Sequence, residues 1–170
     1  MYNSREVMYM TESERRMRRC CFTGHRPEKM SWTEAYVKVW LEDNIRKAID
    51  DGFTSFITGM ARGTDIWTAE IVIRLRASNP QLHLIAASPY EGFERSWSME
   101  WQQAYKEILS VADLVRFVCP RYSRECFQIR NEWMVDHSAR VIAVYNGQPS
   151  GTGNTVRYAL ASGVETIIIE

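Results

Sequence analysis

The stretch FTSFITGMARGTD (residues 53–65) combines three signals that point to one kind of fold. It begins with a short apolar run, continues through a loop that holds Gly59 and Gly63, and ends at Asp65, where a helical pattern starts. An apolar strand, a glycine-containing loop and a helix in this order form the repeating unit of a parallel α/β sheet. Because the loop leads into a helix N-terminus, it also offers unpaired backbone N–H groups that attract an anion.

The same alternation extends in both directions, from Cys20 to the end of the chain. Strand-like runs lie at residues 20–24, 53–58, 82–87, 113–118, 141–145 and 166–170. Helical patterns lie at residues 31–51, 65–77, 94–109, 124–138 and 155–162. We therefore expect residues 18–170 to form one Rossmann-like three-layer α/β domain, with a mainly parallel sheet of about six strands and helices on both faces.

The first long helix has a start signal and an end signal. Ser31 is followed three residues later by Glu34, which is the capping-box pattern and predicts Ser31 as the N-cap. Asp51-Gly52 predicts the end of this helix, since glycine is favoured just past a helix C-terminus.

Residues 1–17 precede the alternating pattern, and we expect them to form a flexible N-terminal extension. Their cluster of arginines is typical of a solvated tail rather than a phosphate site. They contain no continuous apolar block, so we predict no signal peptide. No segment of the chain is long and apolar enough to span a bilayer. The sequence thus predicts a cytoplasmic protein with no membrane partner.

The balance of charge bears on the class of partner. Lys and Arg together number 21, and so do Asp and Glu. Nonspecific nucleic-acid binders normally carry excess positive charge, so this balance argues against nucleic acid as a partner. The four cysteines show no pair at zinc-site spacing. We interpret them as reduced, mostly buried thiols and predict no metal site.

Polar and glycine-rich segments follow several of the predicted strands. The carboxyl ends of parallel strands meet at one edge of the sheet, where such folds bind their ligands. The ligand-binding candidates from these segments and from the helix after the fourth strand are Gly24, His25, Arg26, Gly59, Arg62, Gly63, Thr64, Asp65, Ser88, Pro89, Tyr90, Arg130, Asn131, Gly151, Thr152 and Asn154. Glycine lets the backbone approach a ligand and arginine binds phosphate in a bidentate manner, so we expect a phosphate-bearing ligand.

Each of these residues also has a structural interpretation. The glycines can serve only to make tight turns, and Thr64 or Asp65 can serve only to cap a helix. His25 can donate to a phosphate or shuttle a proton, but it can equally hold a backbone carbonyl in place. Arg130 can bind phosphate or remain a surface cation.

Five segments, read together, resemble the YpsA-like family of the SLOG superfamily. They are CCFTGHRPEK, FITGMARGTDIWTAEIV, LIAASPYEGFE, CFQIRNEWMVD and GTGNTVRYA, and they occur in the right order from Cys20 onward. This superfamily is related to DNA-processing protein A and to the "Lonely Guy" cytokinin-activating enzymes. The resemblance implies a Rossmann-like fold that binds a nucleotide or an NAD- or ADP-ribose-like ligand, with no obligatory cofactor. It is also compatible with a homodimer.

The resemblance also bears on catalysis. The "Lonely Guy" enzymes cleave the N-glycosidic bond of nucleoside monophosphates and use an arginine upstream of a PGGxGTxxE motif. Arg130 and Met134 look like the upstream arginine and methionine, but Thr155 stands where the glutamate would be. The catalytic candidates are therefore Asp65, Glu70 and Arg130, with none assigned. We expect a ligand-binding or sensor domain, with a nucleotide glycosidic-bond hydrolase and single-stranded DNA binding as alternatives.

Overall fold

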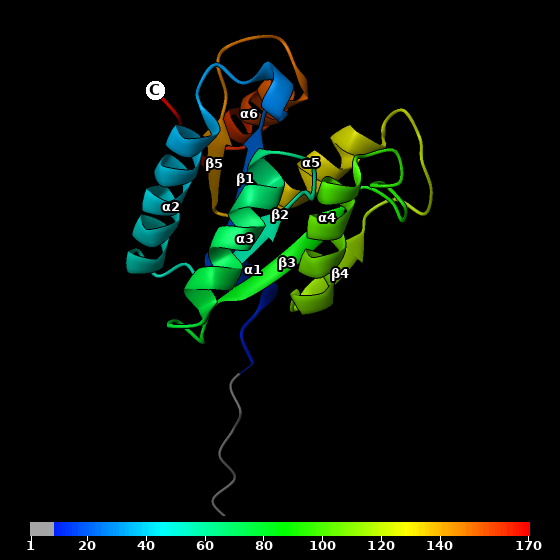
Figure 1. Ribbon diagram of the computed structural model, residues 1–170. Helices are drawn as coiled ribbons and strands as arrows, with labels where there is room; N and C mark the ends of the chain where they lie inside the picture. Colours follow the sequence, from blue (N-terminus) through cyan, green and yellow to red (C-terminus); the bar gives the residue numbers. More distant parts are fainter. Residues whose placement is uncertain (1–8) are drawn as a thin grey trace, which may run out of the picture.

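The computed structural model of the chain describes residues 9–170 and contains one sheet of parallel strands (Figure 1). The strands are β1 (Arg19–Gly24), β2 (Ser55–Thr58), β3 (His83–Ser88), β4 (Leu114–Phe117), β5 (Arg140–Val144) and β6 (Glu165–Ile168). They are ordered β4-β3-β2-β1-β5-β6, and every neighbouring pair is parallel. The order reverses between β1 and β5, so the carboxyl ends of these two strands flank the switch point where a ligand is expected.

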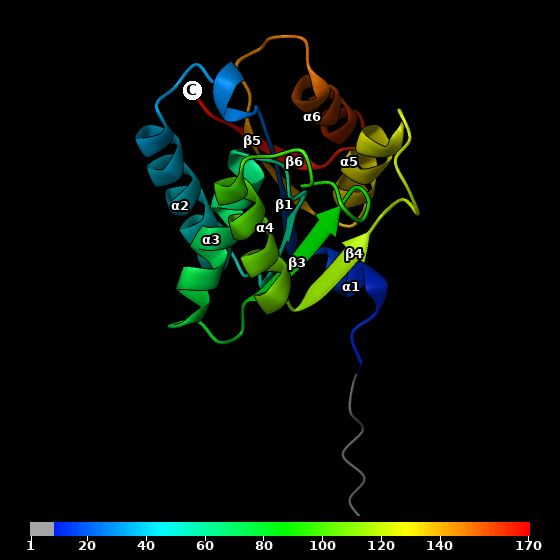
Figure 2. The ribbon, with the colours of Figure 1, turned by 45° about the vertical axis from the view of Figure 1, so that its right-hand side comes forward.

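Helices cover both faces of the sheet and complete the predicted three-layer fold (Figures 1 and 2). The helices are α1 (Glu12–Arg16), the 3₁₀ turn η1 (Pro27–Lys29), α2 (Glu34–Asp50), α3 (Thr64–Arg76), α4 (Met99–Val111), α5 (Cys126–Asp136) and α6 (Gly151–Ala161). Helices α2, α3 and α4 pack on one face, and α5 and α6 pack on the other. The Rossmann-like architecture expected from the sequence is confirmed.

Strand β1 shows why the sheet must be covered on both sides. Its successive side chains point to opposite faces. Cys20 and Phe22 belong to the core beneath α2 and α3, whereas Cys21 belongs to the core beneath α5 and α6. All three side chains are fully buried. Burying a side chain as large as Phe22 contributes about 1.5–3 kcal/mol, so a two-sided apolar strand is stable only between two helical layers.

Three helix starts differ from the sequence prediction. Helix α4 begins at Met99 rather than at residue 94, because residues 91–96 form turns instead. The N-cap of α2 is Thr33, whose side chain accepts a hydrogen bond from the Tyr36 N–H at 3.2 Å, so the capping box predicted at Ser31 is wrong. The Ser31 hydroxyl instead accepts a hydrogen bond at 2.8 Å from the side chain of Asn146, in the loop after β5. Helix α6 begins at Gly151 rather than at Thr155, because Ser150 caps it four residues earlier than the prediction.

Helix α1 forms inside the segment expected to be an extension, of which residues 1–8 lie outside the described part. Thr11 and Glu14 form a capping box, with the Glu14 side chain accepting from the Thr11 N–H at 2.7 Å. The Arg16 guanidinium donates to the carbonyl of Asp136, at the end of α5, at 2.8 Å. Arg19 forms an ion pair with Glu12. These bonds attach α1 to the domain.

None of the helices that the structure describes has both the length and the apolar character required to cross a bilayer.

Candidate functional site

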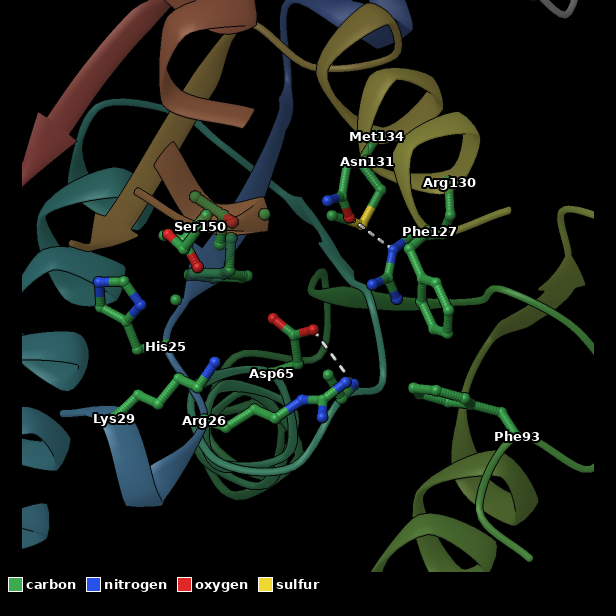
Figure 3. A pocket seen from close by; sticks show the side chains of 16 residues that line it. His25, Arg26, Lys29, Asp65, Phe93, Phe127, Arg130, Asn131, Met134 and Ser150 are labelled. Carbon is green, nitrogen blue, oxygen red and sulfur yellow. Dashed lines mark hydrogen bonds between the residues drawn. The ribbon is translucent and has the colours of Figure 1, made fainter. Parts of the chain in front are cut away.

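A cavity of about 270 Å³ opens at the carboxyl edge of the sheet, over the switch point between β1 and β5 (Figure 3). Its walls come from the end of β1 and the 3₁₀ turn after it, the segment that leads from β2 into α3, the loop after β3, helix α5 and the start of α6. The lining residues are Phe22, Thr23, Gly24, His25, Arg26, Lys29, Ala61, Asp65, Phe93, Phe127, Arg130, Asn131, Met134, Ser150, Gly151 and Thr152. The cavity lies near the lower end of the size range of small-molecule sites.

A buried carboxylate and a buried guanidinium form the floor of this cavity. Asp65 lies in the first turn of α3 and Arg130 in the middle of α5, and both side chains are almost fully buried. Burial raises the pKa of Asp65 although the Arg130 charge opposes this, and burial lowers the pKa of Arg130 although Asp65 opposes that. The two charges therefore compensate each other in a site where neither would be stable alone.

The hydrogen bonds of this pair leave one acceptor unused. Arg130 donates from Nη1 to the carbonyl of Gly59 and from Nε to the Asn131 side chain, the latter at 2.7 Å. Asp65 accepts the Ala61 N–H at 3.1 Å through Oδ2, while its Oδ1 is buried without a partner among the described residues. A buried carboxylate oxygen without a donor is costly, so a ligand that donates a hydrogen bond here would be stabilised.

Gly59 and Gly24 create the space in which this floor forms. A Cβ on Gly59 would lie 2.7 Å from Arg130 Nη1 and 2.8 Å from Asp65 Oδ2. A Cβ on Gly24 would lie 2.1 Å from the hydroxyl of Thr64, at the start of α3. The two glycines thus allow α3 to pack against β1 and allow both charged side chains to lie close to Gly59, just past the end of β2.

The opposite wall of the cavity is the N-terminus of α6. Ser150 caps this helix by accepting the Gly153 N–H at 3.1 Å, and Ser150, Gly151 and Thr152 line the cavity. The first N–H groups of a helix lack partners within the helix and carry partial positive charge, which makes this terminus a seat for an anion. Arg26 and Lys29 add positive charge to the cavity lining, and in Figure 3 their side chains extend below the cavity, across from Ser150.

His25 joins the two loops at the switch point. Its Nε2 accepts the Asn146 N–H at 3.2 Å, and its ring centroid lies 5.7 Å from that of Tyr145. Burial lowers the pKa of His25, so the ring is neutral at pH 7 and carries its proton on Nδ1. The contact that the structure shows for His25 is a structural one. Its partner is the backbone N–H of Asn146, whereas the sequence suggested a backbone carbonyl.

An aromatic wall closes the side of the cavity next to α5, and the sequence analysis did not identify it. The rings of Phe93 and Phe127 lie 5.7 Å apart, and Tyr90 and Tyr122 pack edge-on against this pair. Phe127 precedes Arg130 by three residues, so helical spacing alone places the two side chains on one face of α5. That spacing was the available signal for Phe127.

The cavity brings together half of the predicted ligand-binding residues. Those that line it are Gly24, His25, Arg26, Asp65, Arg130, Asn131, Gly151 and Thr152. Those that surround it without lining it are Gly59, Arg62, Gly63, Thr64, Ser88, Pro89, Tyr90 and Asn154. Three of the outer residues have partners of their own: Arg62 pairs with Glu28 at 2.8 Å, Ser88 shares a 2.7 Å hydrogen bond with the Tyr105 hydroxyl, and Asn154 accepts from Arg157.

The catalytic candidates separate in the same way. Asp65 and Arg130 lie in the cavity, but Glu70 lines a different groove together with Lys38 and Trp67. Asp65 is therefore the one carboxylate among the residues that line the cavity. Thr155 is buried, and its hydroxyl donates to the Gly151 carbonyl at 2.9 Å within α6. Residues 9–170 contain no group of three or more His, Cys, Asp and Glu side chains arranged to hold a metal.

Comparison with known proteins relates this fold and site to a family. Residues 20–166 match the family model YpsA, which is described as the YspA SLOG family. The SPbeta prophage-derived protein YoqJ of Bacillus subtilis (strain 168) is 34% identical over 136 residues, which cover 70% of this chain and 80% of YoqJ. A UPF0398 protein of Ligilactobacillus salivarius (strain UCC118) is 28% identical over 117 residues, which cover 68% of this chain. The alignment spans 64% of that relative, less than two thirds of its length.

A solved structure shares the fold. DNA processing protein A from Helicobacter pylori, described for its single-stranded DNA binding mode, superposes with a TM-score of 0.66 at 18% identity. The superposition covers 94% of this chain and 67% of that protein. At this identity the likeness concerns the fold alone. The family match covers most of the chain and confirms the resemblance seen in its motifs, so the chain belongs to the YpsA family of SLOG proteins.

Proposed function

We propose that the chain binds a nucleotide or a nucleotide-derived ligand of the NAD or ADP-ribose kind in this cavity, and that it acts as a sensor or regulatory domain. One observation carries the proposal: the N-terminus of α6 and the unpaired Oδ1 of buried Asp65 face the same cavity. The helix N-terminus suits a phosphate, and the unpaired carboxylate oxygen suits a hydroxyl group that donates a hydrogen bond. A nucleotide carries a phosphate and ribose hydroxyls only a few bonds apart.

The arrangement of the walls suggests how such a ligand would lie. A phosphate would bind the backbone of residues 150–152, with Arg26 and Lys29 neutralising its charge. A ribose hydroxyl would donate to Asp65 on the floor. The base would then reach the aromatic wall of Phe93 and Phe127, where a flat ring gains contact with other rings.

Binding without cleavage is favoured by the groups that are missing from the cavity lining. Glycoside hydrolysis commonly employs two carboxyl groups, one as acid and one as nucleophile or base, and within residues 9–170 Asp65 is the single carboxylate that lines this cavity. The hydroxyl of Thr155 is already bonded within α6. The hydrolase alternative therefore depends on Asp65 alone, with Arg130 on the phosphate.

A thermal-shift screen tests this proposal. The purified chain would be heated with AMP, ADP, ADP-ribose, NAD, cyclic nucleotides or inorganic phosphate, and the same samples analysed by chromatography for released base. A ligand present at a hundred times its Kd stabilises the native state by about 2.7 kcal/mol. A shift in Tm with intact ligand, lost in Asp65→Ala, supports a binding domain. Released base that disappears in Asp65→Asn would support the hydrolase instead, and no shift with any compound would refute nucleotide binding.

Single-stranded DNA is the second candidate ligand. The structural neighbour DNA processing protein A is described for its single-stranded DNA binding mode, so the expectation that nucleic acid is not a partner lacks support from this comparison. Tyr122 beside the aromatic wall is 63% exposed and lies between Arg121 and Arg124 in sequence. Exposed aromatic rings among arginines suit stacked bases and a phosphate backbone.

Anisotropy of a labelled thymidine oligonucleotide, measured over a salt series, tests this second candidate. Binding that weakens steeply with salt, prefers single strands to a duplex of the same length, and falls in Tyr122→Ala would support it. Competition by ADP-ribose would place both ligands in one site. Equal binding of single and double strands would count against a specific role in single-strand binding.

A further inference from the structure

Two buried cysteines lie at the ends of the segment PRYSRE (residues 120–125), which joins β4 to α5. Cys119 precedes this segment and is 7% exposed, whereas Cys126 is the first residue of α5 and is fully buried. Both residues meet at the carbonyl of Pro89. The Cys119 N–H donates to it at 2.9 Å, and the Cys126 thiol donates to it at 3.0 Å.

Further contacts place the two thiols next to each other. The Cys119 sulfur lies 4.0 Å from the carbonyl oxygen of Cys126. Burial, together with the neighbouring Cys119 thiol, raises the pKa of the Cys126 thiol to about 12. The other two cysteines of the chain, Cys20 and Cys21, are adjacent in β1 and point to opposite faces of the sheet, so they cannot pair.

We propose that Cys119 and Cys126 are a redox modification site, at which the two thiols form a reversible disulfide that ties together the ends of residues 120–125. The oxidant is a low-molecular-weight disulfide of the glutathione class. The Cys119 thiolate attacks one sulfur of this oxidant and releases one thiol, which leaves a mixed disulfide on Cys119. The Cys126 thiolate then attacks the Cys119 sulfur and releases the second thiol.

The overall reaction is balanced. Two S–H bonds of the protein are replaced by one S–S bond, and the oxidant is reduced to two thiols that carry the two protons. Cys119 reacts first because it has the exposed surface of the pair. The second step requires the Cys126 thiolate, whose raised pKa makes its population small at pH 7 and larger as the pH increases.

A disulfide at this site would restrain the segment that packs against the aromatic wall. Tyr122, within the tied segment, packs on Tyr90 and Phe127, and Phe127 directly follows Cys126. A cross-link between Cys119 and Cys126 would also remove the Cys126 thiol from the Pro89 carbonyl. We expect the segment to exchange its amide hydrogens more slowly when oxidised. Any effect on ligand affinity rests on the proposed function, whereas disulfide formation does not.

Mass spectrometry of the full chain tests the proposal. The protein is incubated at pH 8.5 with oxidised glutathione or with a reducing agent, alkylated in denaturant and digested with trypsin. Cleavage at Arg116, Arg121, Arg124 and Arg130 separates FVCPR from ECFQIR, so the disulfide appears as a linked pair of these two peptides. We expect two of the four thiols to disappear in the oxidised sample, and hydrogen exchange over residues 120–127 to slow at least severalfold.

Matched variants make the outcome decisive. Cys119→Ser and Cys126→Ser should each abolish the linked peptides, whereas Cys20→Ala should keep them, with circular dichroism confirming that each variant is folded. Four free thiols in the oxidised wild type, or a glutathione adduct that stays on Cys119 without forming the cross-link, would overturn the proposal. A disulfide in a protein that binds none of the nucleotides tested would refute the proposed function and leave this site standing.

Discussion

Arg130 and Asp65 lie on either side of Gly59 at the carboxyl edge of the sheet although their helices, α5 and α3, pack on its opposite faces. Both side chains reach across the end of β2, where Arg130 Nη1 and Asp65 Oδ2 each lie within 2.8 Å of the position that a Cβ of Gly59 would occupy. The two charges therefore influence each other across Gly59, between the two helical layers and beneath the cavity. Changing either residue should affect both the stability of the fold and the binding site.

Arg130→Ala should destabilise the fold strongly, because it leaves the Asp65 carboxylate buried without its counter-charge. Leaving a buried charge without the opposite charge that compensates it costs about 3–5 kcal/mol. For a domain of this size each kcal/mol changes the Tm by about 2–4 °C, so we expect a decrease in Tm on the order of 10 °C. Urea unfolding of Arg130→Ala, Asp65→Asn and the double variant measures the coupling. Additive free energies of unfolding would show that the two residues do not interact.

Arg62→Ala is the matched control. Arg62 was also predicted to bind a ligand, but its side chain is a quarter exposed and pairs with Glu28 outside the cavity lining. A surface ion pair of this kind contributes about 0–1 kcal/mol, so the Tm should change by only a few degrees. Ligand-induced shifts in Tm should be retained in Arg62→Ala. Their loss would mean that the binding surface extends beyond the cavity.

Gly59→Ala should weaken ligand binding more than it weakens the fold. Gly59 does not have a positive φ, so alanine is compatible with its backbone. The added methyl group would stand 2.7 Å from the end of the Arg130 side chain and must displace it. Because Arg130 and Asp65 are buried there and both must shift, we expect a loss of about 1–3 kcal/mol in stability, as for overpacked cores. The Kd for the ligand should increase at least tenfold in calorimetric titration, and an unchanged Kd would contradict the assignment of this floor to the binding site.

Much of the fold followed from the sequence because it depends on local patterns. Short apolar runs alternate with helical periodicity, and a strand buried on both faces has a continuous apolar run, as β5 has from Val141 to Val144. The end of β1 and the segments that follow β1 and β2 contributed Gly24, His25 and Asp65 to the cavity lining, because parallel strands end at the same edge.

The parts that the sequence did not predict depend on contacts between distant segments. Ser31 and Thr33 both precede α2, and Thr33 is the N-cap. The Ser31 hydroxyl instead accepts a hydrogen bond from the side chain of Asn146, which is 115 residues away in the sequence. The capping box that does form, between Thr11 and Glu14, had the expected spacing but lacked a long apolar pattern after it. Phe93 came from a loop after β3 with no periodicity, and only the packed structure brings it to Phe127.

The stability of the protein should decrease as the pH falls below about 6.5, the ordinary pKa of histidine, because of His25. Burial lowers the pKa of His25 in the folded state. Between the folded and unfolded pKa values the unfolded chain binds more protons, so lowering the pH through this window favours unfolding. His25→Gln keeps an acceptor for the Asn146 N–H and does not titrate. Its Tm should therefore fall less than that of the wild type between pH 7.5 and 5.5, and equal slopes would show that His25 does not titrate differently in the two states.

The N-terminus of α6 can be tested separately for its roles in folding and in binding, because Ser150 contributes to both. Its hydroxyl caps the helix by accepting the Gly153 N–H at 3.1 Å, and the residue lines the cavity. Ser150→Ala removes the cap and should cost about 1 kcal/mol of stability, which is a few degrees in Tm.

Ser150→Asp keeps a capping oxygen but places a negative charge where the phosphate is expected to bind. We therefore expect this variant to match the wild type in Tm and to lose at least tenfold in affinity for a phosphate-bearing ligand, since like charges would face each other at the start of α6. Ser150→Ala should show the reverse order, with a lower Tm and a smaller loss of affinity. Calorimetric titration with ADP-ribose or inorganic phosphate, paired with thermal melts, distinguishes the two variants. If Ser150→Asp binds phosphate as tightly as the wild type, the ligand's anionic group lies elsewhere, and the cations Arg26 and Lys29 become the next residues to test.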